Sequence, residues 1–340
     1  MNNFKKTILV VGGAGYIGRH TVVELYISGY EVIVLDNFCN SKRGVFEKII
    51  PITGRETPFI EGDVRDKGTL DEIFLKNNIY AVIHFSGLKS ISESLERPLE
   101  YYDNNVSGTT TLCLAMQKAN VKKLIFSSSA TVYGVPNEVP ISELNKTGEQ
   151  TNPYGRSKLI AENIMQDLAE SDSDWSIALL RYFNPIGVHS LGVIGEEINP
   201  PTPPANLMPY ISGGALGTYE HLDVYGGDYP TKDGTGVRDY IHVVDLAKGH
   251  VKALDYLDRS KGIGIWNMGT GKGYSVFEMV REFENISGIK IPFKIRPRRS
   301  GDVAECWSNP EKAKKELQWE ANYTLNDMMR HTWDWIKESH

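Results

Sequence analysis

Two side chains that can move a proton together, Tyr154 and Lys158, stand four residues apart. Pro153 fits the first position of a helix, and Asn152 or Thr151 can cap it, so we expect a helix to begin here. Residues four apart share one helix face. A free phenol has a pKa of about 10, which a neighbouring cation lowers by roughly 1–3 units. The pair predicts a tyrosine base, although this spacing alone more often belongs to an ordinary surface Tyr and Lys.

The N-terminal residues place that pair in a nucleotide-binding context. Thr7–Val11 is a short apolar run typical of a buried strand, and the glycine-rich turn Gly12–Gly18 follows it directly. An amphipathic helix to about Ser28, a strand at Glu31–Leu35 and then Asp36 complete a dinucleotide-binding unit. The helix start binds a pyrophosphate, while the acidic residue binds the ribose hydroxyls of NAD and repels the extra phosphate of NADP. NAD is therefore the predicted cofactor.

The composition favours a soluble enzyme. With 340 residues, of which 41% are hydrophobic, the chain can bury one large core or two modest ones. A net charge of -6 gives no reason to expect nucleic-acid binding, and no apolar run suggests a membrane span or a signal peptide. The three cysteines cannot all pair and show no metal-ligand spacing. We expect a cytoplasmic protein without a metal site.

Strands and helices alternate through the first half of the chain. A long helix is expected at Pro98–Asn120, and further strands are expected at Thr57–Ile60, Tyr80–Phe85, Lys122–Ser128 and Trp175–Arg181. This order predicts an α/β fold of the Rossmann type, with a doubly wound parallel sheet. Ligands of such sheets lie at the carboxyl ends of the strands, where Ser86, Ser129 and Tyr182 fall.

The pattern changes after Tyr182. Residues 183–240 are rich in Pro, Gly and Asn and are expected to be loops that cover a ligand. Helical periodicity returns near Val243–Leu257, Ser275–Ser287, Pro310–Leu317 and Leu325–Lys337, with a strand near Ile263–Met268. We expect an NAD-binding domain of residues 1–182, to which residues 237–268 contribute. Residues 183–236 and 269–340 are expected to form a smaller C-terminal α/β substrate-binding domain.

Several blocks of sequence match one family. They are Gly12–Gly18, Leu35–Asn37, His84–Lys89, Tyr101–Asn105, Ser127–Gly134, Asn152–Lys158, Leu180–Pro185, Asn206–Tyr210 and Asp233–His242. On these blocks the chain resembles the extended short-chain dehydrogenase/reductases and, among them, the UDP-glucose 4-epimerase (UDP-galactose 4-epimerase) family. The resemblance implies NAD-dependent 4-epimerisation of UDP-hexoses through a transient 4-keto sugar. It also implies a homodimer joined by the helices near Pro98–Asn120 and after Pro153.

The same resemblance implies a role for each site residue. Tyr154 takes the proton of the sugar 4-hydroxyl, Ser129 hydrogen-bonds to the same oxygen, and Lys158 lowers the pKa of Tyr154 and holds the nicotinamide ribose. The residues expected around NAD are Gly12, Gly15, Tyr16, Ile17, Gly18, Asp36, Asn37, Asn40, Ser41, Asp63, Val64, Phe85, Ser86, Lys89, Asn104, Lys158 and Phe183. The residues expected around the UDP-sugar are Lys89, Ser129, Tyr154, Asn184, Asn206, Leu207, Tyr225, Arg238, Arg299, Asp302 and Cys306.

Two other functions are compatible with parts of this pattern. Nucleotide-sugar 4,6-dehydratases of the same superfamily resemble the chain through the Tyr and Lys, but they usually place an Asp-Glu pair just after the active-site hydroxyl. Ala130 and Thr131 stand there instead, and neither can act as an acid or base for the elimination of water. A relative that binds NAD without catalysis would be expected to lose Tyr154 or Lys158, and both are present.

At position 306 the chain has a cysteine that differs from the residue of some family members, and this difference bears on substrate specificity. Some family members carry Tyr at this position, facing the sugar pocket, where a bulky ring leaves little room for an N-acetyl group at C2. Because exclusion of a substrate depends on such a clash, the smaller cysteine predicts that UDP-GlcNAc and UDP-GalNAc are also interconverted. The alternative is that Cys306 only packs as a small apolar residue.

Overall fold

The computed structural model describes residues 5–196, 204, 206–299 and 301–339. A seven-stranded parallel sheet with the order β10-β6-β5-β4-β1-β2-β3 forms its centre. The strands are β1 (Thr7–Val11), β2 (Glu31–Asp36), β3 (Phe59–Glu61), β4 (Ile79–His84), β5 (Lys123–Ser129), β6 (Ser176–Tyr182) and β10 (Gly262–Met268). This architecture confirms the predicted Rossmann-type fold.

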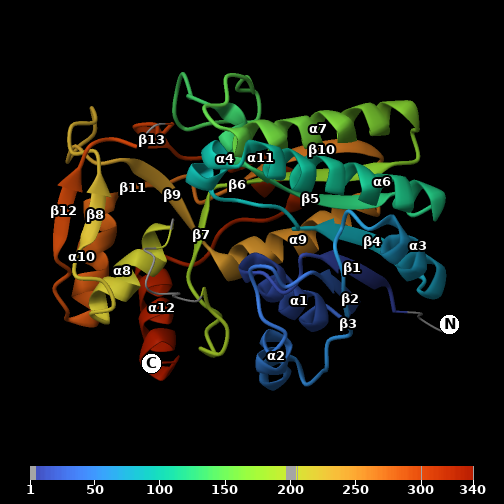
Figure 1. Cartoon of the computed structure of the whole chain (residues 1–340), viewed down its shortest axis with the longest axis horizontal. Helices are drawn as coiled ribbons and strands as arrows, with labels where there is room; N and C mark the ends of the chain where they lie inside the picture. The colour runs from blue at the N-terminus through green and yellow to red at the C-terminus, as the bar shows by residue number, and fades with distance from the viewer. Residues whose placement is uncertain (1–4, 197–203, 205, 300, 340) are drawn as a thin grey trace.

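Helices cover both faces of this sheet (Figure 1). One face carries α1 (Tyr16–Ile27), α2 (Val45–Thr53) and α9 (Val243–Leu257). The other carries α3 (Lys67–Lys76), α6 (Gly108–Lys118) and α7 (Pro153–Ser171), with the short α4 (Ile91–Glu96) and α5 (Pro98–Tyr102) beside them. Among the helices of the described residues, none combines the length and the apolar character that a bilayer crossing requires.

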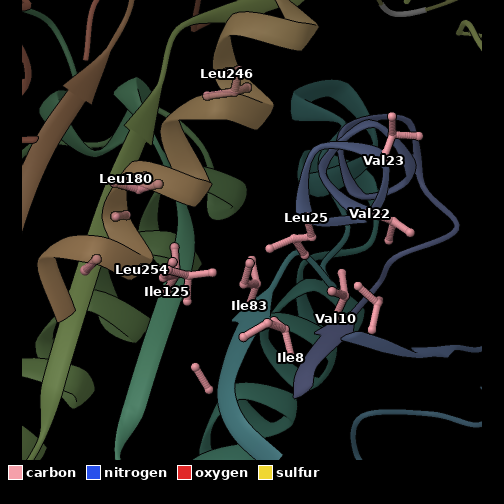
Figure 2. Packing of buried hydrophobic residues seen from close by; sticks show 14 of the residues in the cluster. Ile8, Val10, Val22, Val23, Leu25, Ile83, Ile125, Leu180, Leu246 and Leu254 are labelled. Atoms are coloured by element: carbon pink, nitrogen blue, oxygen red, sulfur yellow. The ribbon is translucent and has the colours of Figure 1, made fainter. Parts of the chain in front are cut away.

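Alternation along the strands explains the two faces. Ile8 and Val10 of β1 point to the layer of α1 and α9 and belong to one buried cluster with Val22 of α1 and Leu254 of α9 (Figure 2). Leu9 belongs to the cluster on the opposite face. Successive side chains of a strand point to opposite sides of a sheet, so a strand buried on both faces is apolar throughout. Each fully buried Val, Leu or Ile contributes about 1.5–3 kcal/mol.

A smaller region beyond the carboxyl ends of the strands contains short strands and its own helices (Figure 1). Its strands are β7 (Asn184–Ile186), β8 (Leu222–Tyr225), β9 (Val237–His242), β11 (Gly273–Ser275), β12 (Phe293–Arg296) and β13 (Glu305–Cys306). Its helices are α8 (Leu207–Ala215), α10 (Val276–Ser287) and α12 (Leu325–Ser339), while α11 (Glu311–Leu317) packs against the large sheet. The strand β9 pairs with β7, β11 and β13, and β8 pairs with β12.

The prediction that residues 183–240 are loops is wrong in part. They contain β7, α8, β8 and most of β9, while residues 197–203 and 205 of the stretch lie outside the described residues. The helix α8 has only nine residues, and Pro209 and two glycines interrupt its sequence pattern. Such short elements are held by packing, as when Met208 and Ile211 are buried against α10 and α12, rather than by intrinsic propensity.

The long helix expected at Pro98–Asn120 is one continuous helical segment with an irregular centre. Between α5 and α6 the residues Asp103–Ser107 form a π-helical turn. This turn contains Asn104, which the sequence assigns to NAD, and Asn105. Single π-helical turns inside α-helices occur frequently at functional sites.

Candidate active site

The glycine-rich turn after β1 is too tightly packed for side chains. Gly12 has a φ of +80°, and a Cβ atom there would lie 2.7 Å from the backbone nitrogen of Ser86. A Cβ atom on Gly18 would lie 2.4 Å from the carbonyl oxygen of Gly12. Gly15 precedes α1, and no side chain of the described residues caps this helix start. Backbone N–H groups at such an uncapped start suit the pyrophosphate of a dinucleotide.

Asp36 ends β2 beside this turn, and only 7% of the residue is exposed. Its Oδ2 accepts a hydrogen bond from the Ala14 N–H at 2.9 Å. Its Oδ1 accepts from the Phe38 N–H at 2.9 Å and from the Ser41 hydroxyl at 3.2 Å. The carboxylate is thereby fixed next to the glycines, as binding of the cofactor ribose requires.

Most of the remaining residues assigned to NAD fall in loops at the carboxyl ends of neighbouring strands, while Tyr16 and Ile17 begin α1 and Asn104 lies in the π-helical turn. Asn37 donates to Asp63 Oδ2 at 3.0 Å, and Arg65 donates to both oxygens of Asp63 at 2.7 and 2.8 Å. Hydrogen bonds from Arg65 hold the pKa of the Asp63 carboxyl well below its ordinary value. Asn40 and Ser41 follow β2, Val64 follows Asp63, Phe85, Ser86 and Lys89 follow β4, and Phe183 follows β6.

The three residues predicted to be catalytic meet at the carboxyl end of β5. Asn152 caps α7 by accepting a hydrogen bond from the Gly155 N–H at 2.8 Å, and this places Tyr154 and Lys158 in the first turns of the helix. Lys158 is 5% exposed, and its Nζ donates to the carbonyl oxygen of Ser127 at 2.6 Å. Ser129 lies close enough to Tyr154 for its side chain to favour the ionised phenol. A phenol, a hydroxyl and an ammonium thus lie together at the end of β5.

The protonation of this group differs from the prediction. Burial raises the pKa of Tyr154 above its ordinary value, and the Ser129 side chain opposes this only in part. Burial lowers the pKa of Lys158 to about 8, with Glu162 opposing the shift. The expectation that Lys158 gives Tyr154 a lowered pKa is therefore wrong for the protein alone. The cause is desolvation of the phenol, which disfavours its charged form more than the neighbouring groups favour it.

The residues assigned to UDP come from several elements of the smaller region. Arg299 lies 4.7 Å from the centre of the Tyr225 ring and donates to Asp302 Oδ2 at 3.0 Å. Arg238 lies on β9, and its Nη1 donates to the carbonyl oxygen of Val237 at 2.9 Å. Asn184 begins β7, and Asn206 and Leu207 begin α8. Planar guanidinium groups beside an aromatic ring are suited to phosphates and a flat base.

Cys306 belongs to the smaller region and packs against residues that neighbour Ser129. Its strand β13 pairs with β9, so that Cys306 lies in register with Arg238. Its side chain packs against a small cluster that includes Ala130, Val132 and Phe183, close in sequence to Ser129 and to the end of β6. Burial raises the pKa of its thiol to about 11. Cys306 is therefore a small, neutral side chain at ordinary pH.

Comparison with known proteins identifies the family. The model of the NAD dependent epimerase/dehydratase family matches residues 8–269. The chain belongs to this family. This epimerase/dehydratase is 55% identical to a UDP-glucose 4-epimerase of Bacillus subtilis, over 96% of each chain. The same name belongs to a protein of Bos taurus that is 51% identical over 98% of this chain and 97% of its own.

Solved structures agree with this assignment. The crystal structure of UDP-glucose 4-epimerase from Bifidobacterium longum in complex with NAD+ and UDP superposes with a TM-score of 0.94, at 51% identity over 98% of both chains. The UDP-Glc/GlcNAc 4-epimerase of Campylobacter jejuni superposes with a TM-score of 0.84, at 33% identity over 98% of this chain and 99% of that one. The family predicted from the sequence motifs is thus confirmed.

Sequence reasoning missed a buried ion pair next to Lys158. Glu162 lies one helical turn after Lys158 and is fully buried. Arg181 of β6 donates to its two carboxylate oxygens at 2.9 and 2.6 Å, and Ser128 donates to Oε1 at 2.5 Å. The helical spacing of Lys158 and Glu162 is visible in the sequence, but the strand partner is not. The pair fixes α7 against β5 and β6.

Asn105 is a second residue that the sequence did not single out. Its side chain accepts from the Leu88 N–H at 2.8 Å and donates to the Leu88 carbonyl oxygen at 3.0 Å. It also donates to the Ser157 hydroxyl at 2.9 Å. Because Ser157 lies between Tyr154 and Lys158, this amide ties the loop after β4 to the catalytic helix. The neighbouring Asn104 was assigned instead.

Proposed function

We propose that this protein is an NAD-dependent UDP-glucose 4-epimerase that interconverts UDP-glucose and UDP-galactose through a transient 4-keto sugar. One observation carries the proposal: Tyr154 and the buried Lys158 lie one helical turn apart on α7, next to Ser129 at the end of β5, at the same sheet edge as the glycine turn. The similarity to curated 4-epimerases over 96–98% of the chain supports it.

The catalytic roles follow from the positions of the side chains. Tyr154 accepts the proton of the sugar 4-hydroxyl and later returns it, and Ser129 hydrogen-bonds to the same oxygen. Bound NAD+ would supply a reversible acceptor for the C4 hydride, and its positive charge would favour the ionised form of Tyr154. Lys158 supplies a second cation and a donor for the ribose. Such cations would offset the raised pKa of the buried phenol.

Strong binding of the nucleotide and weak binding of the sugar suit this reaction, because the keto sugar must turn over between the two hydride transfers. We assign the nucleotide to Asn184, Asn206, Leu207, Tyr225, Arg238, Arg299 and Asp302. Binding energy placed on a part of the substrate that does not react leaves the reacting ring free to move. The domain division at residues 182, 236 and 268 fits this separation of roles and remains our proposal.

The dehydratase alternative receives no support from the site. A 4,6-dehydratase needs an acid and a base near C5 and C6, and the positions after Ser129 hold Ala130 and Thr131. Thr131 donates instead to the Ser129 oxygen at 3.0 Å, where it orients that hydroxyl. A non-catalytic role is disfavoured by the presence of Tyr154 and Lys158. The reaction therefore ends with the inverted hexose rather than with a 4-keto-6-deoxy sugar.

We also propose that the protein interconverts UDP-GlcNAc and UDP-GalNAc. The small, partly buried Cys306 side chain is the supporting feature, since it leaves room where a larger ring would block an N-acetyl group. The likeness to the UDP-Glc/GlcNAc 4-epimerase of Campylobacter jejuni is compatible with this substrate range.

A homodimer in the cytoplasm completes the proposal. Helices on one side of the large sheet expose apolar side chains: Leu95 is 48% exposed, Leu99 81%, Leu114 55% and Ile160 38%. A second copy that covers this face would bury them. The three cysteines are free, as is usual in a reducing compartment. Sedimentation of the purified protein at twice the mass of one chain would support the dimer, and sedimentation as a monomer would refute it.

The function is tested by offering UDP-galactose and UDP-GalNAc separately to the purified protein without added NAD. We expect UDP-glucose and UDP-GlcNAc to form, and chromatography with mass detection distinguishes them from dehydrated products. Formation of a 4-keto-6-deoxy sugar would establish the dehydratase instead, and no turnover of either substrate would leave only NAD binding.

A further inference from the structure

The Glu196 carboxylate bridges two residues that we assign to ligands. Its Oε1 accepts a hydrogen bond from Lys89 Nζ at 3.2 Å and another from Asn206 Nδ2 at 2.8 Å. Lys89 follows β4 of the large sheet, whereas Asn206 is the N-cap residue of α8 in the smaller region. One carboxylate oxygen therefore connects the NAD side of the site to the UDP side.

The backbone that carries Glu196 is held from both sides. The side chain of Arg19 on α1 donates to the carbonyl oxygen of Gly195. A Cβ atom on Gly195 would lie 2.6 Å from the Trp335 ring of α12, so the chain passes directly against that ring. Ile194 is buried in the core beneath the large sheet. These contacts keep the Glu196 side chain, which is 20% exposed, within reach of Lys89 and Asn206.

Glu196 accepts hydrogen bonds from two donor groups that an anionic ligand can also bind. Lys89 has three N–H donors and a full positive charge, and the Asn206 amide supplies further donors. Phosphate and carboxylate oxygens accept the same donors. Arg299 is similarly paired, with Asp302 at 3.0 Å. A nucleoside diphosphate that enters this site must therefore exchange with protein carboxylates.

We infer that Glu196 is a positioning residue that holds Lys89 and Asn206 in place for the diphosphate of the nucleotide sugar and competes with it for them. The inference rests on the proposed function, because it uses the assignment of Lys89 and Asn206 to ligands. It has a kinetic consequence. When the product leaves, the carboxylate gives both donors an immediate partner, so that release is easier than from an unpaired ammonium.

The substitution Glu196→Gln tests this directly, because it keeps an accepting oxygen and removes the charge. The dissociation constant of UDP, measured by calorimetry on the NAD-loaded protein, is expected to fall about two- to fivefold, as for the loss of a half-exposed ion pair. The KM for UDP-galactose should fall with it. Glu220→Gln makes the same charge change at an exposed surface position of the smaller region, where the Glu220 side chain is 87% exposed, and should leave both values unchanged.

The same substitution in a Lys89→Met protein distinguishes competition for Lys89 from a general repulsion between Glu196 and the diphosphate. With Lys89→Met in place, Glu196→Gln should give little further gain in UDP affinity, because the shared donor is gone. Unchanged or weaker UDP binding by Glu196→Gln, or a full gain that persists in Lys89→Met, would overturn the inference. A wild-type protein that binds UDP without epimerising would refute the proposed function and leave this comparison valid. A wild-type protein that does not bind UDP would overturn both.

Discussion

The two sides of the proposed site offer different kinds of groups to their ligands. The proposed NAD side is built around a closely packed glycine turn, where a Cβ on Gly12 or Gly18 would meet neighbouring backbone, and around Asp36 at 7% exposure, although Asn37, Asn40 and Lys89 are exposed. The UDP side relies on charged and aromatic side chains that reach solvent, such as Tyr225 at 37% exposure beside Arg299. The closely packed backbone of the glycine turn is rigid, whereas charged side chains that pair with each other can exchange that partner for a ligand. The cofactor is thus expected to stay bound while nucleotide sugars come and go.

The largest effect on activity should come from substitution of Tyr154, which lies between the two sides. Tyr154→Phe removes the proton acceptor while it keeps the ring, and kcat is expected to fall about 10²- to 10⁴-fold. Bound NAD should remain at the wild-type level, because the cradle of β1 and α1 is untouched. Ultraviolet spectra of the denatured protein report the NAD content. Loss of NAD together with activity would make Tyr154 a structural residue.

The next effect separates the two sides. Arg238→Gln should raise the KM for UDP-galactose about tenfold or more, since a hydrogen bond to a charged group contributes about 1.5–3 kcal/mol. The NAD content should not change. Arg296→Gln, which removes a cation from β12 that pairs with Asp223, is the matched control and should have little effect. Equal KM values for the two variants would remove Arg238 from the nucleotide site.

A smaller effect concerns the width of the sugar pocket. Cys306→Tyr should lower the turnover of UDP-GalNAc at least about tenfold relative to UDP-galactose, because the larger side chain meets the N-acetyl group. The proposed UDP contacts serve both substrates, so the KM for UDP-galactose should change little. The ratio of the two rates is the measurement. An unchanged ratio would show that Cys306 only fills space.

The smallest effect is on stability and depends on pH. Because burial lowers the pKa of Lys158 to about 8 from 10.5, both folded and unfolded protein are protonated there below pH 8. Above pH 8 the folded protein releases this proton first, so the free energy of unfolding rises relative to Lys158→Met, by on the order of 1 kcal/mol. Denaturant titrations of both proteins without NAD measure the difference. If the difference in unfolding free energy between the two proteins fell as the pH rose above 8, the lowered pKa of Lys158 would be contradicted.

The large sheet was predictable because its signals are local. The glycines, the apolar runs and the Pro153 helix start each lie within a few residues, and the structure places them as expected. In the smaller region, β8 pairs with β12 some 70 residues later, and α8 is too short for periodicity to reveal. These elements depend on tertiary packing, which one sequence does not display.

The candidate site also contains residues that the sequence indicated and residues that it did not. The spacing of Tyr154 and Lys158 and the position of Ser129 at a strand end indicated the catalytic group. Asn105 and Glu196 were missed, because their partners lie 52 and 107 residues away in sequence. The sign of the pKa shift of Tyr154 was also missed. Helical spacing gives the neighbouring cation but not the loss of water around the phenol, which decides the direction.

The central claim is that the hydrogen at C4 leaves and returns within one protein molecule while Tyr154 handles only the hydroxyl proton. Conversion of UDP-galactose carrying deuterium at C4, by purified protein in ordinary water without added NAD, tests it most directly. Mass and proton spectra of the UDP-glucose formed should show the deuterium retained at C4. Its replacement by solvent hydrogen, or its absence from C4 in a dehydrated product, would contradict the account.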